Sequence, residues 1–147
     1  MSKSTVMENE LLKLVFNNIA MAGVGDTNGL LPSGNGGVFY ISLHTADPGN
    51  AGNQSSSETT YTGYARVAVT RNSSGFTVVN SSVNFTNNVD FGNCTANPGN
   101  PITHFGIGDA ATGAGKLRYS GTLTPNIAVA AGVTPRITSA ANLITED

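Results

Sequence analysis

The sequence predicts an all-β protein, a β-sandwich of jelly-roll type with one amphipathic helix near the N-terminus. Two observations predict this fold class. Gly, Asn, Thr and Ser supply 65 of the 147 residues, and chains so rich in turn formers and Thr are typical of β-proteins with many loops. Short apolar stretches that alternate with polar residues recur between the turns, and this pattern indicates about eight to ten short strands.

Length and composition indicate one domain, spanning residues 1–147. Regularly spaced Val, Ile, Leu, Phe and Tyr residues provide it with a core, which argues against disorder. Only 11% of the residues are charged, against roughly 25% in ordinary soluble domains. Because a free monomer usually keeps itself soluble with more charge, this composition favours a protein that works inside an assembly.

The helix is predicted at about residues 5–21. Thr5 and Glu8 have the spacing of a capping box, and Gly23 follows as a stop signal. Apolar residues at three- and four-residue steps mark one face, which consists of Met7, Leu11, Leu14, Val15, Phe16 and Ile19. This face packs either on its own domain or on a neighbouring subunit. In the second case the candidate interface residues are Leu11, Leu14, Val15 and Phe16.

The strands are expected, in chain order, at 38–44, 61–70, two positions within 76–85, 89–92, 102–107, 117–123, 127–133 and 135–144. A loop with six glycines, residues 23–37, connects the helix to the first strand. A polar loop, residues 46–60, connects the first two strands. Loops of that length are either functional or merely mobile.

Residue types of catalytic and metal sites occur, but not in the arrangements that the chemistry requires. Ser42, His44 and Asp47 are the types of a nucleophilic triad, yet Ser42 and His44 fall on the same face of one strand, whereas a nucleophile and its base normally come from separate elements. His44 and His104, with Asp47 or Asp109, lack the spacing of metal ligands. We therefore assign no catalytic residue and no metal ligand, and the roles of His44 and His104 stay open.

Residues 110–117 come near the pattern of a phosphate-binding loop, which is Gly, four residues, Gly-Lys and then Ser or Thr. Ala110 stands in place of the first Gly, and Leu117 replaces the hydroxyl residue that would hold magnesium. A strand is expected to follow, so no helix N-terminus would face the phosphates. No cofactor is therefore predicted.

Charge and hydropathy also exclude two classes of partner. The seven basic residues are scattered and the net charge is −2, so no basic tract for nucleic acid is present. No apolar run approaches the ~20 residues of a membrane span. The first residues lack the apolar region of a signal peptide, so we expect synthesis in a cytoplasm, without a membrane partner.

Three stretches carry a resemblance to a known family. They are Val-Phe-Tyr-Ile-Ser-Leu-His-Thr-Ala-Asp-Pro-Gly at 38–49, Tyr-Thr-Gly-Tyr-Ala-Arg at 61–66, and Thr-His-Phe-Gly-Ile-Gly at 103–108, which continues into 115–124. Together they resemble small phage virion proteins of the tail fibre or capsid decoration type. Within that family the similarity is greatest to the capsid cementing protein of a short-tailed Bordetella phage, and it extends over roughly residues 8–146.

The resemblance implies a non-enzymatic structural protein of the virion, made in the host cytoplasm. The leading function is capsid cementing, on the capsid surface, with the major capsid protein as partner. The low charge and the apolar helix face also predict that the protein associates with itself, most simply as a two-fold dimer. The alternative is a tail fibre or receptor-binding module. A carbohydrate-processing enzyme is poorly supported, because glycosidases need two suitably placed carboxylates and most of the nine acidic residues fall in loops or termini.

Overall fold

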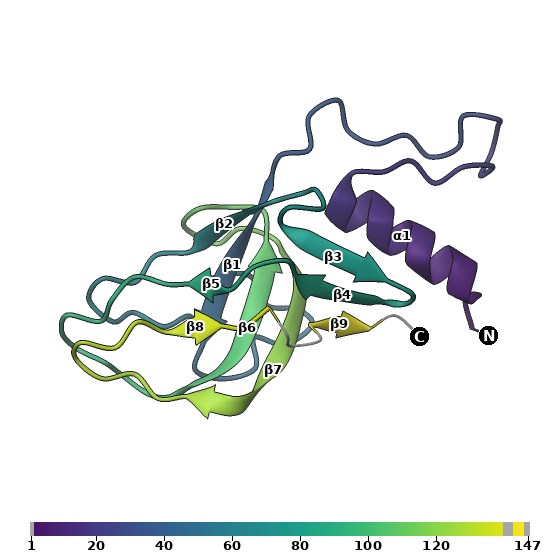
Figure 1. Ribbon diagram of the computed structural model, residues 1–147. Helices are drawn as coiled ribbons and strands as arrows, with labels where there is room; N and C mark the ends of the chain where they lie inside the picture. The colour runs from purple at the N-terminus through teal and green to yellow at the C-terminus, as the bar shows by residue number, and fades with distance from the viewer. Residues whose placement is uncertain (1, 140–142, 146–147) are drawn as a thin grey trace. The chain divides into compact units, whose positions relative to one another are not determined.

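The computed structural model describes residues 2–139 and 143–145. The chain is mostly β, with several antiparallel sheets and one N-terminal helix (Figure 1). It divides into two compact units. Unit 1 consists of Met1–Val38, Thr70–Asn87 and Thr138–Asp147, and unit 2 of Phe39–Val69 and Asn88–Ile137. The all-β prediction with one helix is confirmed, but within the described residues neither unit forms a jelly roll or a closed sandwich.

Unit 1 is built from helix α1 (Thr5–Asn17) and a three-stranded sheet in the order β3 (Phe76–Val79), β4 (Ser82–Phe85) and β9 (Ile144–Thr145). The helix lies along β3 and β4 (Figure 1). Its Phe16 ring packs on Phe76, with ring centroids 5.0 Å apart, and Phe76 packs on Phe85 at 5.6 Å. These rings, together with the fully buried Leu12 and Val83, form the core of the unit.

The helix begins where the sequence predicts, but it is shorter and differently capped. The N-cap is Ser4 rather than Thr5, and its hydroxyl accepts from the Met7 amide at 3.3 Å. The helix ends at Asn17, four residues before the predicted end, because Asn18 adopts a left-handed conformation with φ 56°. Asn tolerates this conformation better than most residues, so Gly23 is not needed as the stop.

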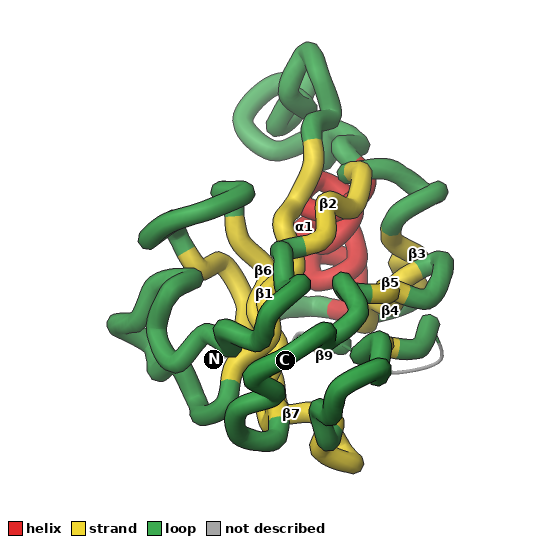
Figure 2. The backbone as a smooth tube through the Cα atoms, turned by 90° about the vertical axis from the view of Figure 1, so that its left-hand side faces the viewer, coloured by secondary structure: helices red, strands yellow, loops and turns green. Residues whose placement is uncertain are grey.

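Unit 2 is built on a four-stranded sheet in the order β2 (Val67–Thr70), β1 (Val38–His44), β6 (Ile102–Gly108) and β7 (Leu117–Ile127). The end residues Val38 and Thr70 of this sheet belong to unit 1. A separate two-stranded sheet pairs β5 (Val89–Asp90) with β8 (Arg136–Ile137). Long loops join these strands (Figure 2). No helix in the described part of the chain is long and apolar enough to cross a membrane.

The register of β1 against β6 gives the central sheet two different faces. Ile41 pairs with Ile107, and Leu43 pairs with Phe105. All four side chains are buried and form the apolar face. The intervening residues point to the opposite face because strand side chains alternate, and segment 53–58 of the long polar loop is hydrogen-bonded to this part of the sheet.

Several predicted strands are shorter than expected or are replaced by turns. The strand predicted at 61–70 begins only at Val67. The chain turns at Gly63, which has φ 103° and approaches Asn93 so closely that an added Cβ would lie 2.1 Å from the Asn93 carbonyl oxygen. The strand predicted at 127–133 is replaced by the end of β7 and a turn around Gly132. In the described part of 135–144, β8 is limited to two residues.

Candidate functional site

Ser42 and His44 lie on the same face of β1, as their spacing predicts. The Ser42 hydroxyl is 2.8 Å from His44 Nε2, and His44 Nδ1 is 2.7 Å from the Ser56 carbonyl oxygen. Because a carbonyl oxygen only accepts, Nδ1 carries the proton and Nε2 accepts from Ser42. Both side chains are fully buried, and burial lowers the pKa of His44. The pair is an internal hydrogen-bond chain without access for a substrate.

The other residues considered for a triad or a metal site do not join this pair. The Asp47 carboxylate accepts from the Gly49 amide at 2.9 Å, within an exposed turn. His104 pairs with His44 in the strand register, but its Nδ1 is 2.8 Å from the Thr103 hydroxyl. Among the residues described, no group of three His, Cys, Asp or Glu side chains is arranged to hold a metal ion.

Arg66 and Glu58 form a nearly buried ion pair, which the sequence did not reveal. Their side chains are 3% and 15% exposed. The guanidinium binds the carboxylate through Nε and Nη2, both at 2.7 Å, and also donates to the carbonyl oxygens of Ala110 at 2.9 Å and Gly113 at 2.7 Å. The Tyr64 hydroxyl donates to Glu58 at 2.8 Å, and burial raises the pKa of Tyr64. These bonds tie the loop of residues 46–60 to the turn between β6 and β7.

Gln54 makes a second connection between the same two segments. Its side chain is fully buried; it donates to the Tyr40 carbonyl oxygen at 3.2 Å and accepts from the Ala110 amide at 2.9 Å. The close fit requires glycine on the opposing side. An added Cβ at Gly108 would lie 2.1 Å from Gln54 Cδ, and one at Gly115 would lie 2.4 Å from Gln54 Oε1. The long polar loop is therefore fastened to the sheet.

This arrangement explains the stretch that comes near a phosphate-binding loop. Residues 110–116 form the turn that receives Arg66 and Gln54. The Ala110 amide donates to Gln54 and the Lys116 amide donates to the Asp109 carboxylate, at 2.9 Å each. Strand β7 follows at Leu117, as predicted. These two amides are therefore engaged, and a strand rather than a helix follows the turn.

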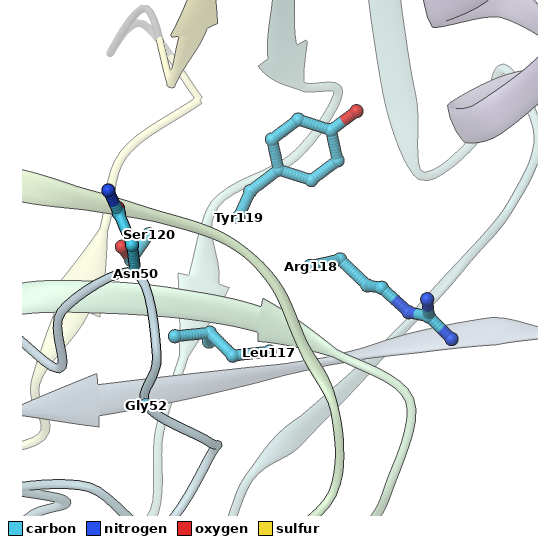
Figure 3. Close-up of a pocket in the computed structure, with 6 residues that line it drawn as sticks. All are labelled: Asn50, Gly52, Leu117, Arg118, Tyr119 and Ser120. Atoms are coloured by element: carbon cyan, nitrogen blue, oxygen red, sulfur yellow. The ribbon is translucent and has the colours of Figure 1, made fainter.

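A shallow hollow of about 420 Å³ lies on unit 2, between the long polar loop and the start of β7 (Figure 3). Its lining residues are Asn50, Gly52, Leu117, Arg118, Tyr119 and Ser120. The Arg118 side chain extends away from Asn50 and Gly52 (Figure 3) and donates to Asp109 at 2.9 Å, with the two side chains 48% and 38% exposed. An open hollow with an exposed ion pair at its edge has no buried polar group to orient a ligand.

The predicted interface residues on α1 differ in exposure. Phe16 is fully buried inside unit 1, whereas Leu11, Leu14 and Val15 are half-buried. Phe16 therefore belongs to the core of its own unit, and an interface role for the other three stays a prediction. The exposed large apolar residues in the described chain are Val6, Met7, Ile19, Val24, Leu30, Leu31 and Val79. All of them belong to unit 1.

Three of these exposed residues lie on the glycine-rich loop after the helix, which is firmly held at its base. Arg71 donates to the carbonyl oxygens of Val15 at 2.7 Å and Gly36 at 2.8 Å. Asn18 and Ser33 exchange hydrogen bonds between side chain and backbone in both directions. Within the loop, Met21 and Leu30 exchange two backbone hydrogen bonds. An ordered loop therefore presents Val24, Leu30 and Leu31 to solvent.

Comparison with known proteins assigns the chain to a family. A family model described as Podophage GP4 fiber I protein gp80 matches residues 2–145, and no curated protein matches the chain. The family description names a fibre protein, so it supports the tail-fibre alternative better than capsid cementing. The chain belongs to the podophage GP4 fiber I protein gp80 family and is a non-enzymatic structural protein of the phage virion, of the fibre type.

Proposed function

We propose that this protein is a building block of a tail fibre that acts by assembling with other virion proteins and with copies of itself. The observation that carries the proposal is the family match over residues 2–145. It favours the tail fibre over the capsid surface. The sequence alone had favoured the capsid surface, with the major capsid protein as partner. A fibre takes part in adsorption to the host cell, so adsorption is the activity to measure.

The distribution of apolar surface supports an assembled protein. Leu31 is 69% exposed and Val6 is 66% exposed. Single exposed apolar residues are common, but here the exposed large apolar residues of the described chain are confined to unit 1. Exposed apolar residues that gather on one part of a protein favour contact with other proteins there. We therefore assign to unit 1 the contacts with a neighbouring protein of the fibre.

The polar clusters of unit 2 support a structural role as well. The His44 chain, the Arg66–Glu58 pair and the Gln54 connection each use their hydrogen-bonding groups inside the unit. Satisfied buried polar networks make a structure more rigid and specific. A rigid module is suitable for a fibre, because the subunits of a fibre have to keep a fixed geometry along its length.

Particles that lack the protein test the proposal. We expect them to lose adsorption to host cells while they retain the genome on heating as well as complete particles do. A capsid cement gives the opposite result, because its loss weakens the shell and leaves adsorption unchanged. Normal adsorption combined with early release of the genome would therefore overturn the proposal and return the protein to the capsid surface.

Variants of the exposed loop test the role of unit 1. Leu30→Ser combined with Leu31→Ser should leave the circular dichroism spectrum unchanged, since both side chains are exposed, but should reduce the amount of protein recovered in particles. Ala111→Ser combined with Ala128→Ser makes two exposed changes in unit 2 and should leave recovery unchanged. Equal recovery of both variants in particles would show that the loop is not part of the assembly surface.

A further inference from the structure

The strand β7 is an edge strand, and Asn50 and Gly52 of the long polar loop lie near its start, where they line the hollow together with residues 117–120. It pairs with β6 along one side (Figure 1) and is the last strand in the order of the four-stranded sheet. None of its eleven residues is buried, whereas most residues of β1 and β6 are. In the described part of the chain, its backbone hydrogen bonds to other strands all go to β6. An edge of this kind offers N–H and C=O groups to an added strand.

The two edges of this sheet are protected to different degrees. At the opposite edge, β2 has only four residues, and very short edge strands discourage further pairing. In β7, Arg118 has no partner in the register with β6 and forms a bulge, and Pro125 interrupts the far end. Between them, residues 119–124 contain neither a charge nor a proline. This stretch is an unprotected edge.

We propose that β7 pairs with β7 of a second copy of the chain, antiparallel and across a two-fold axis at Gly121. The proposal rests on the proposed function, because it names the surface through which copies of an assembling protein join. Gly121 is the midpoint between the Arg118 bulge and Thr124. Pairing centred there uses residues 119–123 and leaves Pro125, which lacks an N–H group, outside the ladder.

Self-pairing in this register is chemically compatible. Tyr119 lies opposite Leu123 of the second copy, and Ser120 lies opposite Thr122 of the second copy. An aromatic–aliphatic pair and a hydroxyl pair are both favourable across antiparallel strands. A two-fold interface brings the same surface of both copies together, so any net charge in it would be repelled. The chain carries no charge from Tyr119 to Pro135, so a copy of itself meets this requirement, and the pairs in the register above favour it as the occupant.

The register predicts a charge-swap experiment. Ser120 and Thr122 are both exposed. Thr122 Oγ1 makes a long contact of 3.4 Å with His104 Nε2, and its loss is a small change, so lysines at these positions should not disturb the fold. Ser120→Lys with Thr122→Lys places like charges directly opposite each other twice and should weaken dimerisation about tenfold or more. Ser120→Lys with Thr122→Glu places opposite charges at both positions and should restore it. Ala68→Lys, which is exposed on β2, is the control and should not change the dissociation constant.

Sedimentation of the purified full-length proteins measures each dissociation constant, and circular dichroism confirms that each variant is folded. We expect a wild-type dimer, a weakened Lys/Lys variant and a restored Lys/Glu variant. A folded monomeric wild type, an unweakened Lys/Lys variant, or a Lys/Glu variant as weak as Lys/Lys would each overturn the proposal. Since purified protein is measured, this result is independent of the adsorption test, so failure of the pairing and failure of the fibre function are distinguishable.

Discussion

Buried His44 gives the folded protein a dependence on pH whose sign follows from its surroundings. Burial lowers its pKa from the ordinary value of 6.5, although the hydrogen bond to the Ser56 carbonyl oxygen acts in the opposite direction. The Ser42 hydroxyl favours the neutral ring by donating to Nε2. In the unfolded chain the ordinary pKa returns. Below about pH 6.5 the unfolded chain therefore binds more protons than the folded protein, so His44 contributes its full stability above this pH, and the contribution is lost as the pH falls towards the lower folded pKa.

We therefore expect the free energy of unfolding to decrease from about pH 7.5 to about pH 5.5, and His44→Gln to reduce this slope. Ser42→Ala is the matched control, because it removes one hydrogen bond but keeps the buried imidazole, and it should keep most of the slope. Urea denaturation at both pH values measures the effect. A His44→Gln variant with the full wild-type slope would assign the dependence to other groups.

Arg66 is expected to be the charged residue that matters most for stability in unit 2. Arg66→Ala leaves Glu58 buried without its partner and removes donors from the Ala110 and Gly113 carbonyl oxygens. Breaking a buried pair in this way costs about 3–5 kcal/mol. Arg136→Ala breaks an exposed pair with Asp90 and should change the midpoint of chemical denaturation little. Equal effects of the two substitutions would contradict the difference in burial.

Most of these contacts could not have been read from the sequence, and the reason is physical. In the sequence, Arg66, Arg118 and Arg136 look alike as scattered charges, and a solvated face is favoured for each over an ion pair or a bond to carbonyl oxygens. Their difference depends on Ala110 and Gly113, whose carbonyl oxygens come from a turn 44 and 47 residues beyond Arg66. Backbone acceptors have no sequence signature. The placement of Ser42 and His44 on the same face of one strand, by contrast, followed from the strand period alone.

At the level of elements, the helix start provides a direct comparison between the predicted cap and the observed one. Ser4 accepts from the Met7 amide, whereas the sequence pattern favoured Thr5. Ser4→Ala should therefore lower the free energy of unfolding by about 1 kcal/mol. Thr5→Ala is the matched control, and it should have little effect because Thr5 is exposed in the first turn. Thermal unfolding of both variants decides between the two caps, and a larger loss for Thr5→Ala would restore the predicted one.

The loop of residues 46–60 shows which features of an element the sequence leaves open. Its length and polarity fitted a functional loop or a mobile one. Instead, it is fastened through Gln54 and Glu58 to partners that lie elsewhere in the chain. Strand positions were easier to predict, since alternation is local, and β1 has the predicted bounds 38–44. Strand ends failed where a turn residue such as Gly63 or Gly132 adopted positive φ.

At the scale of the whole molecule, the sequence predicted a structural protein of the virion, but it did not determine to which part of the virion the protein belongs. Low charge and many turn residues are expected of any protein that works in a shell or a fibre, so composition does not separate them. The family match over residues 2–145 supports the fibre. The division into two units was also not visible in the sequence, because each unit combines distant stretches of the chain and no linker composition separates them.

This division leads to a prediction about folding. Unit 1 consists of three stretches and unit 2 of two, so the chain passes between the units at 38–39, 69–70, 87–88 and 137–138. Folding of unit 2 pairs β1 with β2. Because the first stretch of unit 1 ends at Val38 and the second begins at Thr70, this pairing brings those two ends of unit 1 close together. Each unit thereby shortens the loops that the other has to close, and this lowers the entropy cost of its folding. The units should therefore unfold together, as one domain.

Calorimetry of the full chain should show a single transition with equal calorimetric and van't Hoff enthalpies. Phe76→Ala removes a buried ring from unit 1, and Ile107→Ala removes a buried side chain from unit 2. Losses of about 3–5 and about 2–5 kcal/mol are typical of such changes. Because the units are coupled, each substitution should shift the whole transition to lower temperature without splitting it. Two resolved transitions, of which Phe76→Ala moves only one and Ile107→Ala only the other, would show that the units fold independently.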